Sequence, residues 1–170
     1  MSAPLWHYED YELGYSGTTG GRTITDADIV NFSGVSGDFN PMHVDDEQAR
    51  AEGPFGGRIA QGLLGTSAMT GLLCRDAPEI LGTRVAGIAF LGLNWRFRAP
   101  ILVGDTIRAA YRVASKRPTS GGESGVIEYE VDVLKHDGTV AQSGTLSLLL
   151  RRRDGQEAPH GRDQSGKVPT

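Results

Sequence analysis

Regular alternation of apolar and polar residues marks the second half of the chain. Residues 106–113 and 127–134 place an apolar side chain at every second position. Successive side chains of a strand point to opposite faces, so a period of two predicts strands with one buried face. Residues 85–98 and 140–150 are also predicted to be strands, and an Asp-Gly turn at 137–138 precedes the last of them.

The connections between these predicted strands are short. Residues 99–105 and 118–124 contain Pro and Gly and are too short to hold a crossover helix. Antiparallel strands can be joined by such turns, whereas parallel strands need a longer connection. We therefore expect the strands to be antiparallel neighbours in the order of the chain.

Two short helices are predicted in the first half of the chain. Thr25 is expected to cap the first of them, with Asp28 at its third position and Gly34 as its end. Asp45 is expected to cap the second, which extends through Glu52 and ends before a Gly-Pro pair.

Residues 62–74 form the most apolar predicted helix. Its apolar side chains cover most of the circumference, and no charged residue occurs before Arg75. A helix that is apolar nearly all round is buried. Residues 1–150 are therefore predicted to be one α+β domain, an antiparallel sheet wrapped around a long central helix. Residues 151–170 are polar, begin with three arginines and are predicted to be a flexible or loosely docked tail.

Composition and charge narrow the class of protein. A chain of 170 residues suits one domain, and a net charge of −4 argues against a nucleic-acid partner. Cys74 is the only cysteine and the four histidines are scattered, so neither a disulfide nor a metal site is expected. There is no signal-peptide pattern and no apolar run of about 18 residues, so we expect a cytoplasmic protein without membrane contact.

The candidate chemistry lies in residues 36–43, Ser-Gly-Asp-Phe-Asn-Pro-Met-His. Asp38 and His43 are five residues apart, and Pro41 is expected to prevent a regular helix between them, which leaves an irregular loop. A carboxylate and an imidazole on one loop can bind the same water, a unit suited to general acid–base catalysis. The same segment also makes a good turn without any catalytic role, and composition alone favours that interpretation.

Together with residues 29–34, this segment resembles the hydratase motif of the MaoC-like (R)-specific enoyl-CoA hydratase family. The resemblance continues through residues 58–64 and 97–105 and extends from about residue 8 to residue 150. It implies the hotdog fold, a catalytic pair formed by Asp38 and His43, and a homodimer or an assembly of dimers with one sheet continuous across each dimer.

The reaction that the resemblance implies is the reversible hydration of a trans-2-enoyl thioester to an (R)-3-hydroxyacyl thioester, or the reverse dehydration. Water would sit between Asp38 and His43, and either residue can carry the proton because two coupled sites titrate as a pair. No cofactor is implied, since coenzyme A enters as part of the substrate. The acyl carrier can be coenzyme A or an acyl carrier protein.

Further candidate residues surround the start of the central helix. Gly62 presents N–H groups of a helix N-terminus that can hold a thioester oxygen, although simple packing of the helix start is the alternative. Gln61 stands where many members of the family have a His, which bears on substrate preference. Asn40 is expected to shape its loop rather than touch substrate. Ser67 could face the site, or be a satisfied buried hydroxyl.

Two other functions remain open. One is a hotdog thioesterase, which commonly uses a carboxylate on or beside the central helix, but residues 63–73 contain no acid. The other is a non-catalytic acyl-thioester-binding module, against which the presence of both Asp38 and His43 argues. Six basic residues could meet the phosphates of coenzyme A, although each is more typical of a solvated strand face: Arg96, Arg98, Arg108, Arg112, Lys116 and Arg117.

Overall fold

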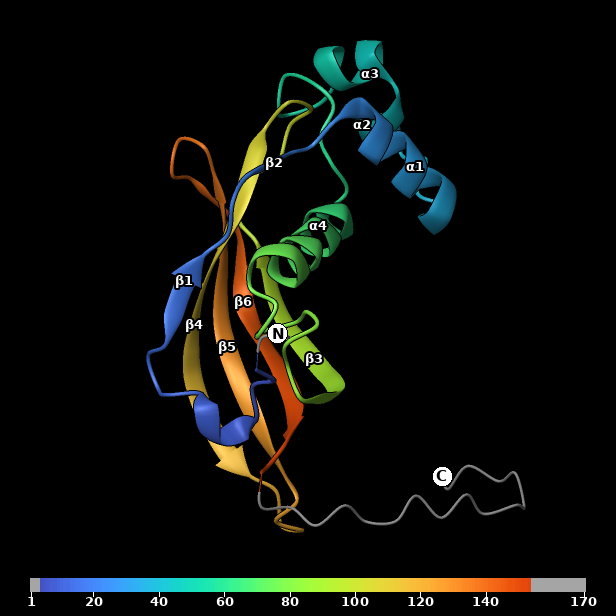
Figure 1. Ribbon diagram of the computed structural model, residues 1–170. Coiled ribbons are helices and arrows are strands. Elements are labelled where there is room, and N and C mark those ends of the chain that lie inside the picture. The colour runs from blue at the N-terminus through green and yellow to red at the C-terminus, as the bar shows by residue number, and fades with distance from the viewer. Residues whose placement is uncertain (1–3, 154–170) are drawn as a thin grey trace, which may run out of the picture.

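A long, curved antiparallel sheet forms one side of the molecule, and a helix lies across its concave face (Figure 1). The computed structural model describes residues 4–153. The main strands are β3 (Gly87–Phe97), β4 (Thr106–Pro118), β5 (Ser124–Lys135) and β6 (Val140–Arg151). The predicted α+β arrangement of an antiparallel sheet with a central helix is confirmed.

Short strands complete one side of the sheet. Strands β1 (Ser16–Thr18) and β2 (Arg22–Thr23) both pair with β4, and neither was predicted from the sequence. Three and two residues are too few for an alternation of apolar and polar side chains to be recognised. Strands β1 and β2 are recognised only by their pairing with β4.

The predicted neighbours of β3 were wrong. The strand order is β1-β4-β5-β6-β3, so β4, β5 and β6 follow in chain order, but β3 pairs with β6 rather than β4. The connection over residues 99–105 crosses the end of the sheet instead of making a turn. Ile101 in this connection is buried, and its carbonyl accepts a hydrogen bond from the N–H of Ala60 at 2.7 Å. Seven extended residues can reach about 23 Å, enough to pass two intervening strands.

The central helix α4 (Gly62–Asp76) lies where it was predicted but is covered on one side only. Met69, Leu72 and Leu73 are buried against the sheet. Leu63 is 64% exposed, and Ser67 and Gly71 on the same face are exposed as well. The apolar content was correctly read, but a single sheet covers only one side of a helix, so burial all round was a wrong expectation for this chain alone.

The first helix, α1 (Asp26–Ser36), begins as predicted. Thr25 and Asp28 form a reciprocal capping box. The helix continues through Gly34 and ends at Gly37, whose φ of 77° is left-handed. Only the second of the two glycines adopts the conformation that ends a helix, which is why the predicted end was three residues early.

The short helix α3 (Asp46–Ala51) is capped by Asp45 as predicted, and its last cap is Glu52. Together α1 and α3 lie beyond one end of α4 in Figure 1. The first turn of α3 has an acceptor in its own cap, because the Asp45 carboxylate accepts a hydrogen bond from the Gln48 N–H at 2.9 Å.

The start and the end of the described chain meet at the other end of the sheet. A 3₁₀ helix, η1 (Tyr8–Asp10), precedes β1. Arg151, predicted to open the tail, closes β6, and Arg153 binds Asp10 through its guanidinium at 2.6 Å. The first residues of the predicted tail therefore belong to the folded unit, and residues 154–170 lie outside the described residues. Within the described part of the chain, no helix is long and apolar enough to cross a membrane.

Candidate functional site

The segment between α1 and α3 turns back on itself and presents two titratable side chains. Asn40 caps a short helix, α2 (Pro41–Val44), by accepting the Met42 N–H at 3.1 Å. His43 therefore lies on a helix, and the expected irregular loop is limited to residues 37–40. Proline is disfavoured inside a helix but favoured at its first position, where it stands here. Asn40 shapes this corner, as the sequence indicated.

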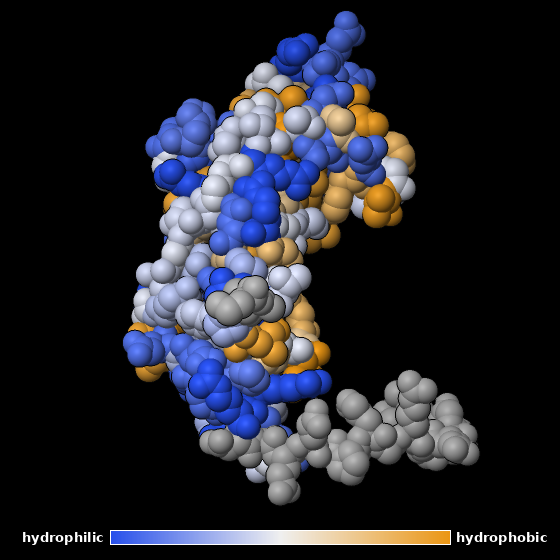
Figure 2. All heavy atoms as spheres, viewed as in Figure 1, coloured by the Kyte–Doolittle hydropathy of each residue, from blue (hydrophilic) through white to orange (hydrophobic). Residues whose placement is uncertain are grey.

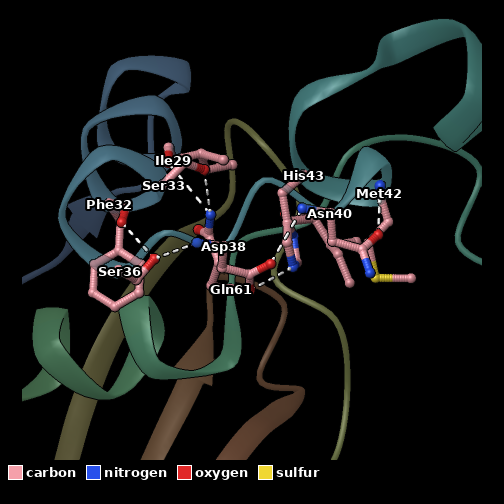
Figure 3. A network of polar contacts seen from close by, with 10 residues as sticks. Ile29, Phe32, Ser33, Ser36, Asp38, Asn40, Met42, His43 and Gln61 are labelled. Carbon is pink, nitrogen blue, oxygen red and sulfur yellow. Dashed lines mark hydrogen bonds and ion pairs between the residues drawn. The ribbon is translucent and has the colours of Figure 1, made fainter.

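Asp38 and His43 face each other across this corner (Figure 3). The Asp38 Oδ2 to His43 Nε2 distance is 3.5 Å. The other ring nitrogen, Nδ1, lies 2.8 Å from the carbonyl oxygen of Ile59. Because a carbonyl can only accept, Nδ1 carries a hydrogen, and Nε2 is the ring nitrogen that faces Asp38.

Burial differs sharply between the two side chains. The His43 side chain is 9% exposed, whereas the Asp38 side chain is 46% exposed. Asp38 is held by its own backbone contacts: its N–H donates to the Ser36 hydroxyl at 3.2 Å, and its Oδ1 accepts the Asn40 N–H at 3.2 Å. The imidazole is thus held inside the protein, and the carboxylate stands at the solvent side.

A pocket of about 650 Å³ opens beside His43 and extends to the start of α4. It brings His43 and Gly62 together, as the sequence predicted. Its walls are mostly apolar and come from α2, the segment before α4, α4, β3, the connection after β3, and β6. They comprise Met42, His43, Phe55, Ile59, Ala60, Gly62, Leu63, Phe97, Arg98, Ala99, Pro100, Ile101 and Gln142.

Gly62 is the first residue of α4, and its N–H has no hydrogen-bond partner among the described residues. The helix carries no side-chain cap, so its first N–H groups are left for another acceptor. A Cβ on Gly62 would lie 2.8 Å from Cε1 of Phe97, so a packing role and a binding role coexist at this glycine.

Gln61 does not line the pocket. Its Nε2 donates to the Ser33 hydroxyl at 2.8 Å and lies 3.4 Å from the Ile29 carbonyl oxygen, and it joins α1 to the start of α4 (Figure 3). The side chain is 3% exposed, and its Oε1 has no partner. Gln61 thus connects the two segments that carry Asp38 and Gly62.

Ser67 does not join the other candidates. It is exposed and lines a neighbouring apolar depression of about 550 Å³ between α4 and β3. The expectation of a buried hydroxyl is wrong for the described residues, and Ser67 does not line the pocket that holds His43. Residues 63 and 67 are one helical turn apart on the uncovered face, and this face could be identified only once the sheet was in place.

Gln142 was missed in the sequence. It lines the pocket from β6, is 2% exposed, and donates from Nε2 to the Gly62 carbonyl at 2.9 Å. A signal was present, because Gln142 is in phase with the buried Leu146, Leu148 and Leu150 of the same strand. A polar residue at an inward position needs a partner, but the sequence does not say which.

Charged groups fix the frame of the site. Arg58 pairs with Asp26 at 2.6 Å and with Asp46 at 2.8 Å, which ties α1 to α3. The hydrogen bond from Arg58 holds the pKa of the Asp46 carboxyl below its usual value.

Of the six basic residues considered for phosphate contacts, Arg98 alone lines the pocket, while the Lys116 ammonium donates to the carbonyl of Tyr8 at 3.0 Å. No three His, Cys, Asp or Glu side chains converge as a metal site within residues 4–153.

Known proteins resemble this chain in sequence. Residues 16–134 match the family model described as MaoC like domain. Over 116 residues the chain is 34% identical to a protein named (R)-specific enoyl-CoA hydratase from Rhodospirillum rubrum, and the match covers 67% of this chain and 74% of that protein.

Solved structures resemble it in fold. A structure described as a monoamine oxidase regulatory protein from an Archaeoglobus species superposes with a TM-score of 0.80 at 31% identity, covering 89% of this chain and 98% of the other. A MaoC-like dehydratase from Rhodospirillum rubrum superposes with a TM-score of 0.76 at 26% identity, covering 87% and 98% of the two chains.

Proposed function

The chain belongs to the MaoC-like domain family and has the hotdog fold, and from this premise we propose that it hydrates a trans-2-enoyl thioester to the (R)-3-hydroxyacyl thioester, or catalyses the reverse dehydration. At the coarser level it is a hydratase or dehydratase of acyl thioesters, a hydro-lyase. The observation that carries the finer proposal is one pocket that holds both His43 and Gly62, with the Asp38 carboxylate 3.5 Å from the imidazole.

Asp38 and His43 suit the binding of a single water. In the tautomer with its hydrogen on Nδ1, the imidazole accepts at Nε2, and Oδ2 of the carboxylate accepts as well, so a water between them would donate one hydrogen to each. Its oxygen lone pairs then point away from the pair, toward a substrate in the pocket. Asp38 is exposed and therefore accessible to water, while burial and the Ile59 carbonyl hold the His43 ring in one orientation.

The hydration adds the elements of water across the conjugated double bond. The water oxygen bonds to the β-carbon while the pair takes one of its protons, and the π electrons move to the thioester carbonyl to give an enolate. The pair then returns a proton to the α-carbon and the carbonyl reforms. Positioned acid–base groups of this kind typically contribute about 10²–10⁴-fold in rate.

The enolate oxygen is the charge that the helix start would stabilise. Gly62 supplies an N–H without a partner at the positive end of a helix of 15 residues. Coenzyme A or an acyl carrier protein would enter as part of the substrate. A thioesterase is less well supported, because the acid of α4 is Asp76 in its last turn, paired with Arg75 at 2.7 Å.

We also propose that the molecule works as a homodimer. Strand β3 ends the sheet order, and no strand within residues 4–153 pairs with its outer edge. Phe90, Leu91 and Leu93 on this strand are 42–51% exposed, and apolar atoms surface near α1 and along β3 in Figure 2. A long apolar edge strand is a template for pairing with another chain, and a second copy would also cover the open face of α4.

The test of the activity is direct. Crotonyl-CoA is mixed with the purified protein, the loss of absorbance of the conjugated thioester is followed, and the product is resolved by chirality. We expect disappearance of the enoyl band and formation of the (R)-3-hydroxy product. Release of free coenzyme A together with crotonic acid, whose double bond is intact, would indicate a thioesterase instead. Binding without either change would indicate a non-catalytic module.

A further inference from the structure

The side-chain amide of Gln142 is hydrogen-bonded at both of its ends beside the pocket. Its amide lies between β3, β6 and α4: Nε2 donates to the Gly62 carbonyl at 2.9 Å, and Oε1 accepts the indole N–H of Trp95 at 3.0 Å. The single hydrogen of the Thr66 hydroxyl can be donated either to Oε1 at 3.1 Å or to the Gly62 carbonyl at 3.2 Å. A buried amide whose two ends are both bonded is costly to rotate, so this side chain has one orientation.

The orientation of the amide is determined by its partners. The indole N–H can only donate, and the Gly62 carbonyl can only accept. Oε1 must therefore face Trp95, and Nε2 must face Gly62. Reversal would place two donors together at one end and two acceptors at the other.

Packing around Gln142 leaves no slack. A Cβ on Gly65 would lie 2.3 Å from Nε2 of Gln142 and 2.8 Å from Cδ1 of Ile101. Glycine at position 65 is what lets the amide reach the first turn of the helix. The pair Gly62 and Gly65 thus admits Phe97 on one side and Gln142 on the other.

The start of α4 faces two opposing requirements. Helix ends fray, and a side-chain cap normally prevents this by occupying the first N–H groups. A cap on α4 would block the N–H that the substrate oxygen needs, and Gln61 supplies none. Gln142 instead binds the first turn from the sheet side, through the Gly62 carbonyl. This contact leaves the N–H groups at the start of α4 unoccupied.

We propose that Gln142 is a positioning residue for the oxyanion site, which orients the first turn of α4 through the Gly62 carbonyl. This inference rests on the proposed hydratase function. Gln142 is expected to act on the transition state through Gly62, because the enolate oxygen needs the donor in place only when its charge develops. Its loss should therefore lower kcat and leave KM nearly unchanged.

The first experiment replaces Gln142 with Met, which has similar length but can neither donate to Gly62 nor accept from Trp95. We expect kcat on crotonyl-CoA to fall by about tenfold or more, below the 10²–10³ lost when an oxyanion donor is removed outright. The matched control is Gln48→Met, the same chemical change at an exposed position of α3. It should leave both constants unchanged.

A second variant, Gln142→Glu, keeps the test decisive if Gln142→Met fails to fold. A protonated carboxyl can donate to the Gly62 carbonyl and accept from Trp95, as the amide does, whereas the ionised form cannot donate. Burial raises the pKa of a carboxyl, so the change falls in an accessible range. The ratio of kcat in this variant to kcat in wild type should rise as pH falls, with folding checked by circular dichroism at each pH.

The outcomes separate the two proposals. Wild type that leaves crotonyl-CoA and longer enoyl thioesters unchanged would remove the hydratase function itself. Active wild type, with a folded Gln142→Met of unchanged kcat, would overturn the positioning role alone. A Gln142→Glu ratio that stays low at every pH would overturn it too. A fall in kcat with steady KM, together with recovery of Gln142→Glu at low pH, would support it.

Discussion

The residues around the pocket differ in burial and in what holds them in place. His43 is buried and oriented by the Ile59 carbonyl, whereas Asp38 is half-exposed and held by the turn after Gly37. Gly62 contributes only its backbone, and its missing side chain leaves room for the Phe97 ring. The consequences of changing each residue therefore differ in kind.

Asp38→Asn should lower kcat by about 10²–10⁴-fold with little change in the melting temperature. The amide has nearly the same shape and can still accept the Asn40 N–H, but it cannot take a proton from water. Turnover of crotonyl-CoA and a melting curve measure the two effects. Asp137→Asn, in the exposed turn before β6, is the matched control and should be fully active. Activity of a folded Asp38→Asn within a few-fold of wild type would remove Asp38 from the mechanism.

Gly62→Val should lower kcat by about 10² or more, because a side chain obstructs the approach of the thioester oxygen and displaces the donor. Some loss of stability is expected too, since the new Cβ would lie 2.8 Å from the Phe97 ring. Gly34→Val is the control, a helical glycine with open space around it. A folded Gly62→Val with nearly normal turnover would make Gly62 a packing glycine only.

At the scale of elements, the ends of helices place the chemistry. The left-handed Gly37 ends α1 and turns the chain so that Asp38 faces back toward α2. Asn40 and Pro41 then start α2, which delivers His43 to the pocket one turn later. A residue that shifts either boundary would separate the carboxylate from the imidazole.

Two glycines of this region should respond oppositely to alanine. Gly34 is exposed inside α1 with nothing near a new Cβ, so Gly34→Ala should stabilise the protein by about 0.5–1 kcal/mol. Gly37 has a φ of 77°, so Gly37→Ala should destabilise it and lower activity by moving Asp38. Chemical unfolding gives both values. Equal effects of the two substitutions would refute this assignment of the helix end.

For the whole molecule, the decisive feature is the apolar surface that residues 4–153 leave uncovered. The sheet wraps one side of α4, and the other side lies open beside the unpaired edge of β3. A depression of about 550 Å³ lined by Leu63, Phe90 and Leu93 joins the two surfaces. Covering both with one partner is the simplest way to remove this apolar area from water.

Replacing both Phe90 and Leu93 by Lys should convert the proposed dimer to a monomer. Two charges at the edge of β3 would have to be desolvated in the interface, which opposes association. Sedimentation velocity at micromolar protein measures the mass. Val35→Lys is the control, because Val35 is 86% exposed on α1, outside this surface. Wild type that sediments as a monomer would contradict the proposed assembly.

The sequence by itself determined the local structure, because local signals act within a few residues. Alternation located β4 and β5, the Asp-Gly turn indicated β6, the Thr25–Asp28 box started α1, and residues 36–43 brought Asp38 and His43 onto one short segment. The role of that pair remains a prediction. The sequence allowed two helix boundaries in two places, and the backbone conformation decided between them. Gly37 rather than Gly34 ends α1, and Pro41 begins a helix instead of preventing one.

Only the tertiary structure decided the contacts between distant residues. The pairing of β3 with β6, the exclusion of Ser67 from the pocket and the bond from Gln142 to Gly62 each join or separate segments far apart in the chain. Gln142 and Gly62 are 80 residues apart, and no periodic pattern encodes which helix turn a strand residue will meet. Such contacts depend on the order of strands and on the path of the crossing connection, which are properties of the packed whole.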